Sequence, residues 1–506
     1  MRLFCILLFL SVAVHASGQF TDRYWTFGDS SGINFQNLSN PVPGHSVLRV
    51  RGTCASICDS AGSLLFYCGS PNVPYWLAGM YYEGFILNKH DSVMDNGDSL
   101  KSELWYQEMV IVPDPASGSR FYVFHIGESS TLNPGLFYSI VDLSYNNGLG
   151  RVVQKNIQLH AFETSDCLAA VKHGNGRDWW VLSRRSDISN NEFYAYLVTP
   201  SGVSGPIISN SGTVTDQDFF RIEFSKDGET LTTVDPKGLV ELHSFDRCTG
   251  VVSLVQTVEP ERTSSPYPFY WSCAFSPDKS KLYVTSIYNG QSQDSSFLFQ
   301  YDLNAANIAA SKDTLHLFHQ PVVAGFVQPG PDGKIYLSCS DESPDCDFFY
   351  LYCDTTYNNY IGNLGVINAP DSAGSACDFQ PFSFWLGGHK SYVGLPNNPN
   401  YELGRLAGSQ CDTLTGITDL KVKEKRLFVN PNPAVDEVWV NALQLTGKEA
   451  ALVIRDLTGK TVFSKVEEIQ GGFLTTRLNI GLLQPGMYFL SVETGTARLV
   501  SPVIKY

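Results

Sequence analysis

The sequence predicts an all-β protein, and three observations support this class. Aromatic residues make up 13% of the 506 residues, together with 43 Gly and 26 Pro. This composition is typical of short strands joined by many tight turns. No apolar pattern with a helical period persists over a long window, and a turn followed by a strand recurs at a nearly constant spacing. The length exceeds one ordinary domain, so more than one domain is expected.

The first 18 residues have the layout of a secretory signal peptide. Arg2 supplies a positive charge, an apolar run extends from Leu3 to Val14, and small residues follow it. We expect cleavage after Ala16 or Gly18. No later apolar run is long enough to span a bilayer, so we expect an exported, soluble protein.

The formal net charge of −15 bears on the partners of this protein. An acidic surface repels phosphate backbones, which disfavours nucleic acid and anionic membranes as partners. An acidic balance is also common among exported proteins, so the charge identifies no ligand.

The cysteines predict disulfide bonds without defining their pairing. Twelve are present, and eleven remain once Cys5 leaves with the signal peptide. An odd number leaves at least one thiol unpaired or shared with another chain. Counting outwards from the turn near Ala61 places Cys54 and Cys68 almost opposite one another, which predicts a bridge between them. Zinc binding is the alternative, although the cysteine clusters lack the paired C-x₂-C spacing of most structural zinc sites.

A turn-and-strand repeat runs through the middle of the chain. A turn of Pro, Asp, Gly, Asn or Ser precedes an aromatic or aliphatic strand, as in FSKDGETLTTV at 224–234. Asp and Gly suit these positions because a tight hairpin needs a residue that tolerates positive φ. The equivalent strand residues, 51 to 58 positions apart, are Leu65, Phe121, Trp179, Leu231, Leu282 and Ile335. The aspartates expected to cap backbone N–H groups in turns are Asp59, Asp142 and Asp278.

A period near 50 with this signature predicts a β-propeller, in which four-stranded sheets pack radially. Six repeats are visible, residues 377–388 suggest a seventh, and residues 24–35 offer a strand that closes the ring. Joining the chain ends in this way removes exposed sheet edges. We therefore expect about seven blades over residues 20–398, with six and eight as alternatives.

Motifs in the same region point to a family. WTFGDSSGINF, LLFYCG, MDNGDSL, AAVKHGNGRDWWVLSR, FSPDKSKLYVTS and VGLPN follow one another between residues 24 and 398. In this order they resemble a family of exported propeller-like proteins of Bacteroidetes. One departure is Asp95, where the family usually has Pro. The resemblance implies the fold and the export, and it implies no activity.

The last part of the chain has a different pattern. Residues 399–423 are rich in Gly, Asn and Thr and poor in large apolar residues, which predicts a linker. Six short alternating runs follow, and in one of them Tyr488, Leu490 and Val492 share a face. This period of two predicts a small immunoglobulin-like β-sandwich over residues 424–506.

This sandwich closely resembles the type A C-terminal sorting domain of the type IX secretion system. The resemblance rests on the opening Asn-Pro-Asn-Pro turn, the RDLTGKTV hairpin, the LLQPGMYFLSV strand and a lysine near the end. It departs at Pro502, which we expect to interrupt the last strand, and at Tyr506, which follows the lysine. The residues that the resemblance assigns to the sorting signal are Asn430, Pro431, Asn432, Pro433, Asp456, Gly459, Lys460, Gly486, Tyr488 and Lys505.

The resemblance implies a route and a set of partners. Such a domain takes a folded cargo from the periplasm across the outer membrane, and a sorting protease commonly removes it within the preceding linker. The cargo is then often attached to surface lipopolysaccharide. The implied location is the cell surface or the medium, and the implied partners are the secretion machinery, its protease and lipopolysaccharide. An ordinary immunoglobulin-like binding domain is the alternative.

No motif predicts a catalytic, cofactor-binding or metal-ligating residue. The sequence has no G-x-S-x-G elbow, P-loop or dinucleotide fingerprint. Aromatic residues at 178–180 and 265–271 are candidate platforms for a sugar or peptide, although packing within blades is the simpler interpretation. The acidic stretch 340–347 offers oxygen ligands for calcium, but its spacing does not follow the EF-hand loop.

The sequence supports two functions for the propeller. The first is a non-catalytic binding or scaffold module that recognises a glycan or a protein. The second is a secreted hydrolase or lyase acting on polysaccharide or protein, with carboxylates gathered from several blades at the axis. Two carboxylates, or a His with a carboxylate, in a clear axial pocket would favour the enzyme, and a bland, loop-filled axis would favour binding or scaffolding.

Overall fold

The chain folds into two units that divide between Asp412 and Thr413. The structure is a computed structural model and describes residues 21–70, 83–102, 105–127, 134–215, 217, 219–263, 268–287, 295–319, 321–341, 359–412, 426–430, 432–443, 445, 447–469, 473–495 and 497–506. The predicted signal peptide lies outside these residues. Among the described residues, no helix has the length and apolar character needed to cross a membrane.

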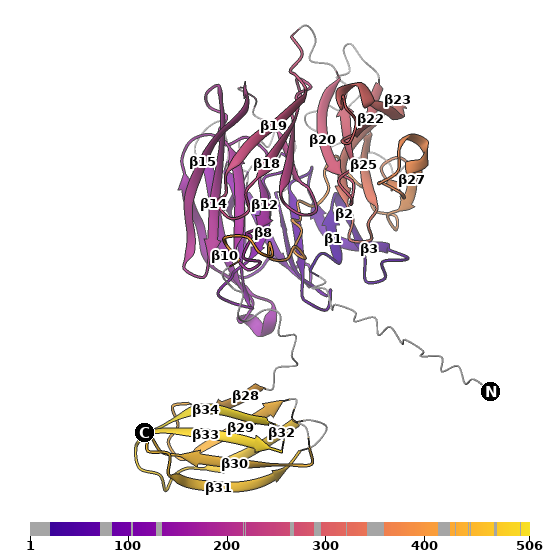
Figure 1. Cartoon of the computed structure of the whole chain (residues 1–506). Coiled ribbons are helices and arrows are strands. Elements are labelled where there is room, and N and C mark those ends of the chain that lie inside the picture. The colour runs from indigo at the N-terminus through magenta and orange to yellow at the C-terminus, as the bar shows by residue number, and fades with distance from the viewer. Residues whose placement is uncertain are drawn as a thin grey trace, which may run out of the picture. The chain divides into compact units, whose positions relative to one another are not determined.

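The first unit contains six four-stranded antiparallel sheets, each with its strands in chain order (Figure 1). The first three consist of β4 (Cys54–Cys58), β5 (Leu64–Gly69), β6 (Glu83–Asn88) and β7 (Leu100–Lys101); β8 (Met109–Pro113), β9 (Arg120–Gly127), β10 (Gly135–Asp142) and β11 (Arg151–His160); and β12 (Ala169–Lys172), β13 (Trp179–Arg184), β14 (Asn190–Thr199) and β15 (Gly202–Thr215).

The other three follow the same plan. They consist of β16 (Arg221–Phe224), β17 (Thr230–Val234), β18 (Val240–Phe245) and β19 (Val252–Glu259); β20 (Phe269–Phe275), β21 (Lys281–Ile287), β22 (Ser295–Asp302) and β23 (Asp313–His319); and β24 (Val322–Pro329), β25 (Ile335–Asp341), β26 (Asn363–Ile367) and β27 (Phe379–Trp385). Within the described part of the chain, short 3-10 helices lie in the connections at Asn146–Gly148, Ala309–Ser311 and Gly374–Cys377.

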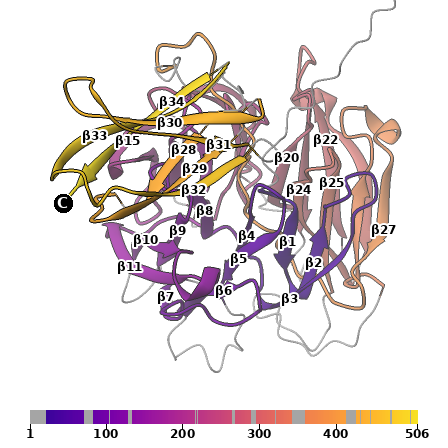
Figure 2. The same cartoon turned by 90° about the horizontal axis from the view of Figure 1, so that it is seen from below.

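These sheets are the blades of a β-propeller. The first strand of each sheet contacts the first strand of the next, from β4 through β8, β12, β16 and β20 to β24. In Figure 2 the sheets follow one another around the ring. The six strand positions predicted from the repeat all fall in the second strand of a blade, in β5, β9, β13, β17, β21 and β25.

A seventh blade closes the ring and corrects one prediction. Residues 377–388 were expected to form it, but β27 is the fourth strand of the sheet that contains β25. The long stretch between β25 and β26 moves this fourth strand one full period along the chain. The seventh blade is instead built by β1 (Tyr24–Phe27), β2 (Asp29–Asn34) and β3 (Val42–Arg49), and β1 contacts β4.

Two of the turns have the predicted chemistry: Asp59 lies between the first and second strands of its blade, and Asp142 lies between the third and fourth strands of the next. Asp59 Oδ1 accepts the N–H groups of Ala61 and Ser63 at 2.8 and 2.9 Å, and Asp142 Oδ1 accepts that of Ser144 at 2.9 Å. In each case the side chain satisfies N–H groups that the tight turn leaves without a strand partner.

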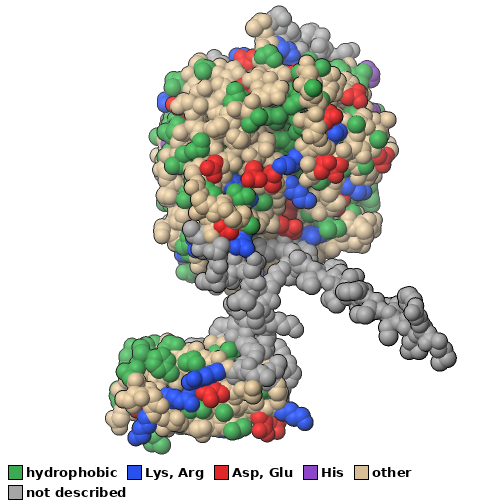
Figure 3. All heavy atoms as spheres, in the orientation of Figure 1, with side chains coloured by type: hydrophobic (Ala, Val, Ile, Leu, Met, Phe, Trp, Pro, Cys, Tyr) green, Lys and Arg blue, Asp and Glu red, His purple; other side chains and the backbone are tan. Residues whose placement is uncertain are grey.

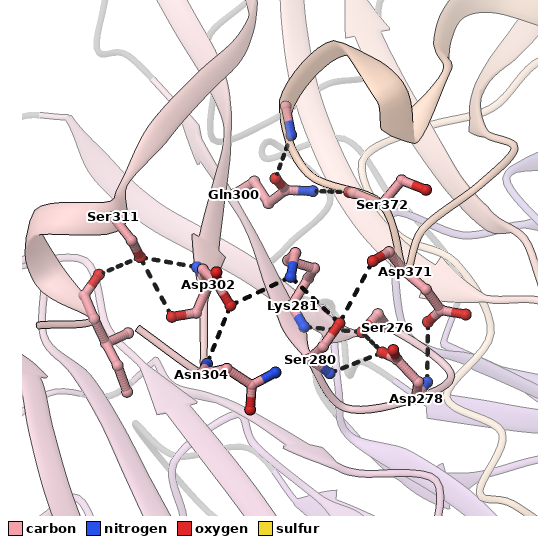
Figure 4. Close-up of polar contacts among 12 residues, drawn as sticks. Ser276, Asp278, Ser280, Lys281, Gln300, Asp302, Asn304, Ser311, Asp371 and Ser372 are labelled. Carbon is pink, nitrogen blue, oxygen red and sulfur yellow. Dashed lines mark hydrogen bonds and ion pairs between the residues drawn. The ribbon is translucent and has the colours of Figure 1, made fainter. Parts of the chain in front are cut away.

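Figure 4 shows the corresponding turn between β20 and β21. Asp278 Oδ1 accepts from Ser276 Oγ and from the Ser280 N–H, both at 2.8 Å. The Asp278 N–H in turn donates to Asp371 Oδ1 at 3.0 Å, which ties this turn to the connection between β26 and β27. The same residues that form the hairpin therefore also join two neighbouring blades.

The second unit is a sandwich of two antiparallel sheets, as predicted. One sheet has the order β28-β29-β32 and the other β31-β30-β33-β34. The strands are β28 (Arg426–Asn430), β29 (Glu437–Leu443), β30 (Glu449–Arg455), β31 (Thr461–Glu468), β32 (Phe473–Asn479), β33 (Gly486–Thr494) and β34 (Ala497–Lys505). Tyr488, Leu490 and Val492 are buried in a core of their own between the sheets.

The last strand is not interrupted at Pro502, which corrects the expectation. β34 continues to Lys505, with Pro502 paired opposite Phe489. A proline is tolerated here because β34 is an edge strand of its sheet, where a missing N–H removes no ladder hydrogen bond.

The predicted bridge between Cys54 and Cys68 is absent, and both are buried free thiols. The strand register places Cys68 opposite Ala55 and Cys54 opposite Gly69. Because side chains alternate along a strand, this shift of one residue sends the two thiols to opposite faces of the sheet. Cys68 accordingly packs in the core cluster with Ala55, and Cys54 packs in a different one.

Candidate functional site

The centre of the propeller is occupied by a segment from the end of the first unit, residues 390–398, called here the axial segment. Lys390 pairs with Asp29 at the start of β2. Further along, Val393 O accepts the Phe326 N–H of β24 at 2.8 Å, and the Gly394 N–H donates to Arg51 O at 3.1 Å. The segment therefore joins β24, the first strand of the last four-stranded blade, to the chain just before β4, the first strand of the first.

A close approach of two backbones requires glycine at this point. A Cβ on Gly394 would lie 2.1 Å from Gly52 Cα, far inside van der Waals contact. Backbone packing therefore accounts for the glycine of the GLPN motif, and no catalytic role is needed to explain it.

Asn397 holds several blades together at the axis. Its Nδ2 donates to Met109 O at 2.9 Å and to Leu168 O at 2.7 Å, and its N–H donates to Cys54 O at 2.8 Å. These acceptors lie at the inner strands of three blades. The segment is therefore a structural part of the propeller.

Beyond the axis, the chain continues as a strap, residues 399–412, that is bound to the propeller. Tyr401 is buried, and its hydroxyl donates to Ile111 O at 2.9 Å. Lys172 Nζ donates to Tyr401 O at 2.8 Å, and Arg247 Nη2 donates to Gly404 O at 2.5 Å. Burial, followed by the nearby Arg247, lowers the pKa of Lys172 to about 8.

A disulfide bond between Cys248 and Cys411 fastens the end of the strap. Gly174 makes room for it, because a Cβ there would lie 2.4 Å from the Cys411 sulfur. The predicted linker, 399–423, therefore begins too early. Residues 399–412 are fastened to the propeller, and residues 413–425 lie outside the described residues.

One pocket opens beside the axial segment, with a volume of about 180 Å³. Its wall comes from the ends of β12, β16, β20 and β24 and the turns that follow them, and the chain from Asn397 to Leu403 forms another side. The polar groups include Asp22, Glu223, Gln328 and Asn400, while Pro277, Pro329, Pro331 and Phe224 contribute apolar surface.

Glu223 is the carboxylate on the blade side of the pocket. Arg221, two residues earlier on β16 and 1% exposed, donates from Nη2 to Glu223 Oε2 and to Gln328 Oε1, both at 2.9 Å. Burial raises the pKa of Glu223, and the charge of Arg221 offsets only part of this effect. The carboxylate is thus tied to a buried arginine.

Asp22 is a second carboxylate on the pocket wall. Burial raises its pKa to about 7, although Asn398 Nδ2 and Trp25 Nε1 donate to its Oδ1 at 2.7 and 2.9 Å. Asp22 therefore exchanges a proton near neutral pH. The sequence had not singled out Asp22 or Glu223, because each becomes informative only where distant blades meet, and Asn397 had appeared only as the last residue of the VGLPN motif.

Near the start of the inner strands, aromatic rings pack around the axis. Tyr106 contacts Trp271 and Phe326 with ring centroids 4.9 and 5.7 Å apart, and all three are buried. Asp166 accepts the N–H groups of Tyr106 and Gln107 at 2.8 and 2.6 Å. This layer holds the inner strands together beneath the pocket.

The aromatic platforms considered from the sequence are packing residues. Trp179 and Trp180 are 2% and 3% exposed, and Tyr270 and Trp271 are also buried. Residues 265–267 lie outside the described part of the chain, as do residues 342–347 of the acidic stretch. Among the described residues, no cluster of three His, Cys, Asp or Glu side chains has the arrangement of a metal site.

The residues assigned to the sorting signal lie at turns and strand ends of the sandwich. Asp456 Oδ1 accepts the N–H groups of Thr458 and Lys460 around Gly459, which has a φ of 84°. Gly486 pairs with Lys505 across β33 and β34. Asn432, whose bond to Pro433 is cis, binds the backbone of β34. Pro431 and the side chain of Asn430 lie outside the described residues.

Comparison with solved structures finds low similarity. A protein named as a 6-phosphogluconolactonase from Bacteroides fragilis has a TM-score of 0.44 and 10% identity, over 74% of this chain and 96% of that one. A periplasmic gluconolactonase of Pseudomonas aeruginosa has a TM-score of 0.33 and 11% identity, over 78% of this chain and 94% of that one. A β-propeller domain from Myceliophteria thermophila has a TM-score of 0.32 and 9% identity, over 63% of this chain and 92% of that one. Similarity at this level says nothing about activity.

No curated protein matches the chain. The family described as secretion system C-terminal sorting domain matches residues 429–506, which is the sandwich described above. This protein is therefore an all-β propeller that carries a type IX secretion sorting domain at its C-terminus and is exported through the periplasm to the cell surface or the medium.

Proposed function

We propose that the propeller is a non-catalytic binding module that acts outside the cell. The observation that carries this proposal is the axial segment, which occupies the centre of the ring and borders a pocket of about 180 Å³. Pockets for drug-sized ligands usually measure about 300–1,000 Å³, so this one accepts a single compact group. We propose that the group belongs to a larger glycan or protein ligand.

The chemistry of the pocket suits a ring that bears hydroxyl groups. Three prolines and Phe224 offer apolar surface, and Gln328 and Asn400 offer amide groups at its border. A sugar ring presents an apolar face together with hydroxyl groups, which makes a glycan the better match. An extended peptide would be recognised through one side chain in the pocket.

A hydrolase is the second candidate, and one observation favours it. Asp22 and Glu223 line the same pocket, and burial raises the pKa of both. Two carboxyl groups of this kind are what acid–base catalysis of glycoside hydrolysis uses. The ion pair of Glu223 with Arg221 and the small volume favour binding instead.

The proposal also covers how the protein is exported, processed and attached to the cell surface. The N-terminal signal layout supports entry into the periplasm, and the resemblance to exported propellers of Bacteroidetes supports an origin there with an outer membrane to cross. We propose that a sorting protease removes the sandwich after Asp412 and that surface lipopolysaccharide receives the propeller. The fastening of residues 399–412 supports a boundary beyond Asp412.

Binding can be tested with the purified protein on arrays of bacterial glycans and peptides. Lys226, exposed on the pocket rim, is changed in Lys226→Trp to narrow the opening. The matched control is Ser60→Trp, at the equivalent position of the exposed turn between β4 and β5. We expect Lys226→Trp to reduce affinity at least tenfold and Ser60→Trp to leave it unchanged. Equal binding by both variants would contradict the pocket as the binding site.

The hydrolase alternative has a separate test. Glycans and proteins bound by the wild type are incubated with it and analysed by mass spectrometry for cleavage. On the binding proposal no product forms. Products that disappear in Asp22→Asn and Glu223→Gln would replace the binding proposal by the enzyme.

A further inference from the structure

The outward face of the larger sheet of the sandwich carries a group of apolar side chains, called here the apolar face. Met487, Phe489 and Val500 are 44%, 41% and 50% exposed. Pro502 is exposed and Ile504 is half-buried. Figure 3 shows hydrophobic side chains gathered at one end of the visible face of this unit.

The strand register places these five side chains together. Met487 pairs with Ile504, Phe489 with Pro502, and Ser491 with Val500 across β33 and β34. Directly paired residues share a face and lie side by side. The alternate residues of β33, among them Tyr488 and Leu490, point into the core. A sandwich strand that already buries one apolar face normally carries polar residues on the other, so this face is an exception.

Several residues assigned to the sorting signal form hydrogen bonds or strand pairs with the two strands that carry the apolar face. Asn432 Nδ2 donates to Pro502 O, and its Oδ1 accepts the Ile504 N–H, both at 2.8 Å. The pair of Gly486 with Lys505 adjoins the pair of Met487 with Ile504. The Tyr488 hydroxyl donates to Gln484 O at 2.8 Å, which fixes the start of β33. The family signature thus supports the two strands that present the apolar side chains.

We propose that the apolar face is the surface by which the secretion machinery recognises this sorting domain, through an apolar patch on the machinery. An exposed apolar group on a small soluble domain marks an interaction surface. The function shown for this domain is export, and four of its ten signature residues lie in or beside the two strands of this face: Asn432, Gly486, Tyr488 and Lys505. Arg455 and Arg498, both paired with Glu493 Oε1 at 3.0 and 3.1 Å, provide a polar border on the same sheet.

Charge argues against a second copy of this chain as the occupant. Residues 413–506 contain 11 basic residues (Lys and Arg) and 9 acidic residues (Asp and Glu). The whole chain contains 35 basic and 50 acidic residues, so most of the negative charge lies outside the sandwich. Two copies would therefore bring two strongly acidic propellers together. The sandwich that carries the apolar face is itself nearly neutral.

The test replaces apolar area on the face and measures export of the full chain in its native cells. The variant Met487→Thr with Phe489→Thr keeps residues that favour strands and leaves the core side chains in place. We expect the amount of protein outside the cell to fall at least tenfold, with accumulation in the periplasm. The matched control is Leu482→Thr, which removes an equally apolar side chain, 98% exposed, from the turn between β32 and β33. Its export should equal that of the wild type.

Two further measurements separate the outcomes. The unfolding transition of the sandwich in purified variants shows whether the domain folds, and Val500→Lys serves as a second variant with an unaltered β33. Folded variants exported at the wild-type level would overturn the proposal. A wild type that is dimeric in solution, with a double variant that is monomeric and fully exported, would assign the face to a second copy and also overturn it.

Discussion

At the scale of single residues, polar groups buried between blades link sheets that are distant in sequence. His243 and Glu241 on β18 are both 0% exposed, with Nε2 and Oε2 3.5 Å apart. Ser211 Oγ on β15 of the preceding blade lies 3.0 Å from His243 Nδ1. Glu241 Oε1 accepts from Thr213 Oγ1 at 2.7 Å and from Thr257 Oγ1 at 3.0 Å. The Glu241 and His243 side chains are closed to solvent, while Thr213 is half-buried and Thr257 exposed, and the contacts with Ser211 and Thr213 join two blades.

The Glu241 carboxylate should make the stability of the propeller depend on pH. Burial acts to raise its pKa, but hydrogen bonds from His243 and Thr213 outweigh burial and hold the pKa below its ordinary 4.5. A carboxyl group with a lowered folded-state pKa stabilises the fold above its unfolded-state pKa and loses this contribution as the pH falls through the folded-state value. We expect the free energy of unfolding to decline below about pH 4.5, as measured by urea denaturation across a pH series.

Removing the Glu241 carboxylate tests how much this network contributes to stability. Glu241→Ala leaves buried donors without their acceptor, so we expect a loss of about 2–4 kcal/mol at pH 7. Glu229→Ala, at an exposed position just before β17, should cost less than about 0.5 kcal/mol. A Glu241→Ala protein with wild-type stability would show that the network contributes nothing.

At the scale of elements, the strap differs from the strands because it has few backbone partners of its own. It depends on side chains of the propeller, including Lys172 and Arg247, and on the bond between Cys248 and Cys411, which are 163 residues apart. A cross-link over so long a loop mainly restricts the unfolded chain.

Cys411→Ser should therefore destabilise the propeller by about 2–5 kcal/mol and lower its Tm. The loss of the anchor should also make the strap a faster site of proteolysis after Tyr401. Thermal unfolding and limited proteolysis check both expectations. Dithiothreitol should reproduce the effect in the wild type and change nothing further in the variant. An unchanged Tm in the variant would contradict a stabilising role for the bond.

At the scale of the whole molecule, the two units have separate cores. The sandwich core consists of residues from 427 to 503 alone, and the division falls at Asp412. The axial segment and the strap belong to the propeller. Folding of the propeller should therefore not require the sorting domain.

Truncation after Asp412 should leave the thermal transition of the propeller unchanged while abolishing export. Truncation after Gly388 should prevent folding, because it removes the axial segment and the contacts of Asn397 with three blades. Calorimetry of the purified proteins and fractionation of expressing cells distinguish these results. A propeller that unfolds without residues 413–506 would show that the two units depend on each other.

The sequence predicted the features that depend on local chemistry. The turns at Asp59, Asp142 and Asp278 and the second strand of each of six blades follow from patterns within about a dozen residues. Six of the seven sandwich strands, β29 to β34, were predicted for the same reason, and β28 was not among the predicted runs. Residues 377–388 were wrongly assigned to the seventh blade, whereas residues 24–35, which were expected to close the ring, do lie in that blade as β1 and β2.

The candidate site was not predictable in the same way. Asp22, Glu223 and Asn397 stand far apart in the sequence, and each has an ordinary local context. The pairing of Cys54 with Cys68 was wrong because a shift of one residue in register reverses the face of a side chain. The strap was mistaken for a linker because Gly and Asn favour flexible chains and also permit close backbone packing.

The sequence by itself determined the all-β class, the repeated blades and the sorting domain, since each is encoded by short-range periodicity or by a motif. Only the tertiary structure decided how the ring closes, which cysteines pair, and that the chain fills its own axis and leaves a small acidic pocket. These features depend on contacts between residues hundreds of positions apart, whose free energy arises only when the blades assemble.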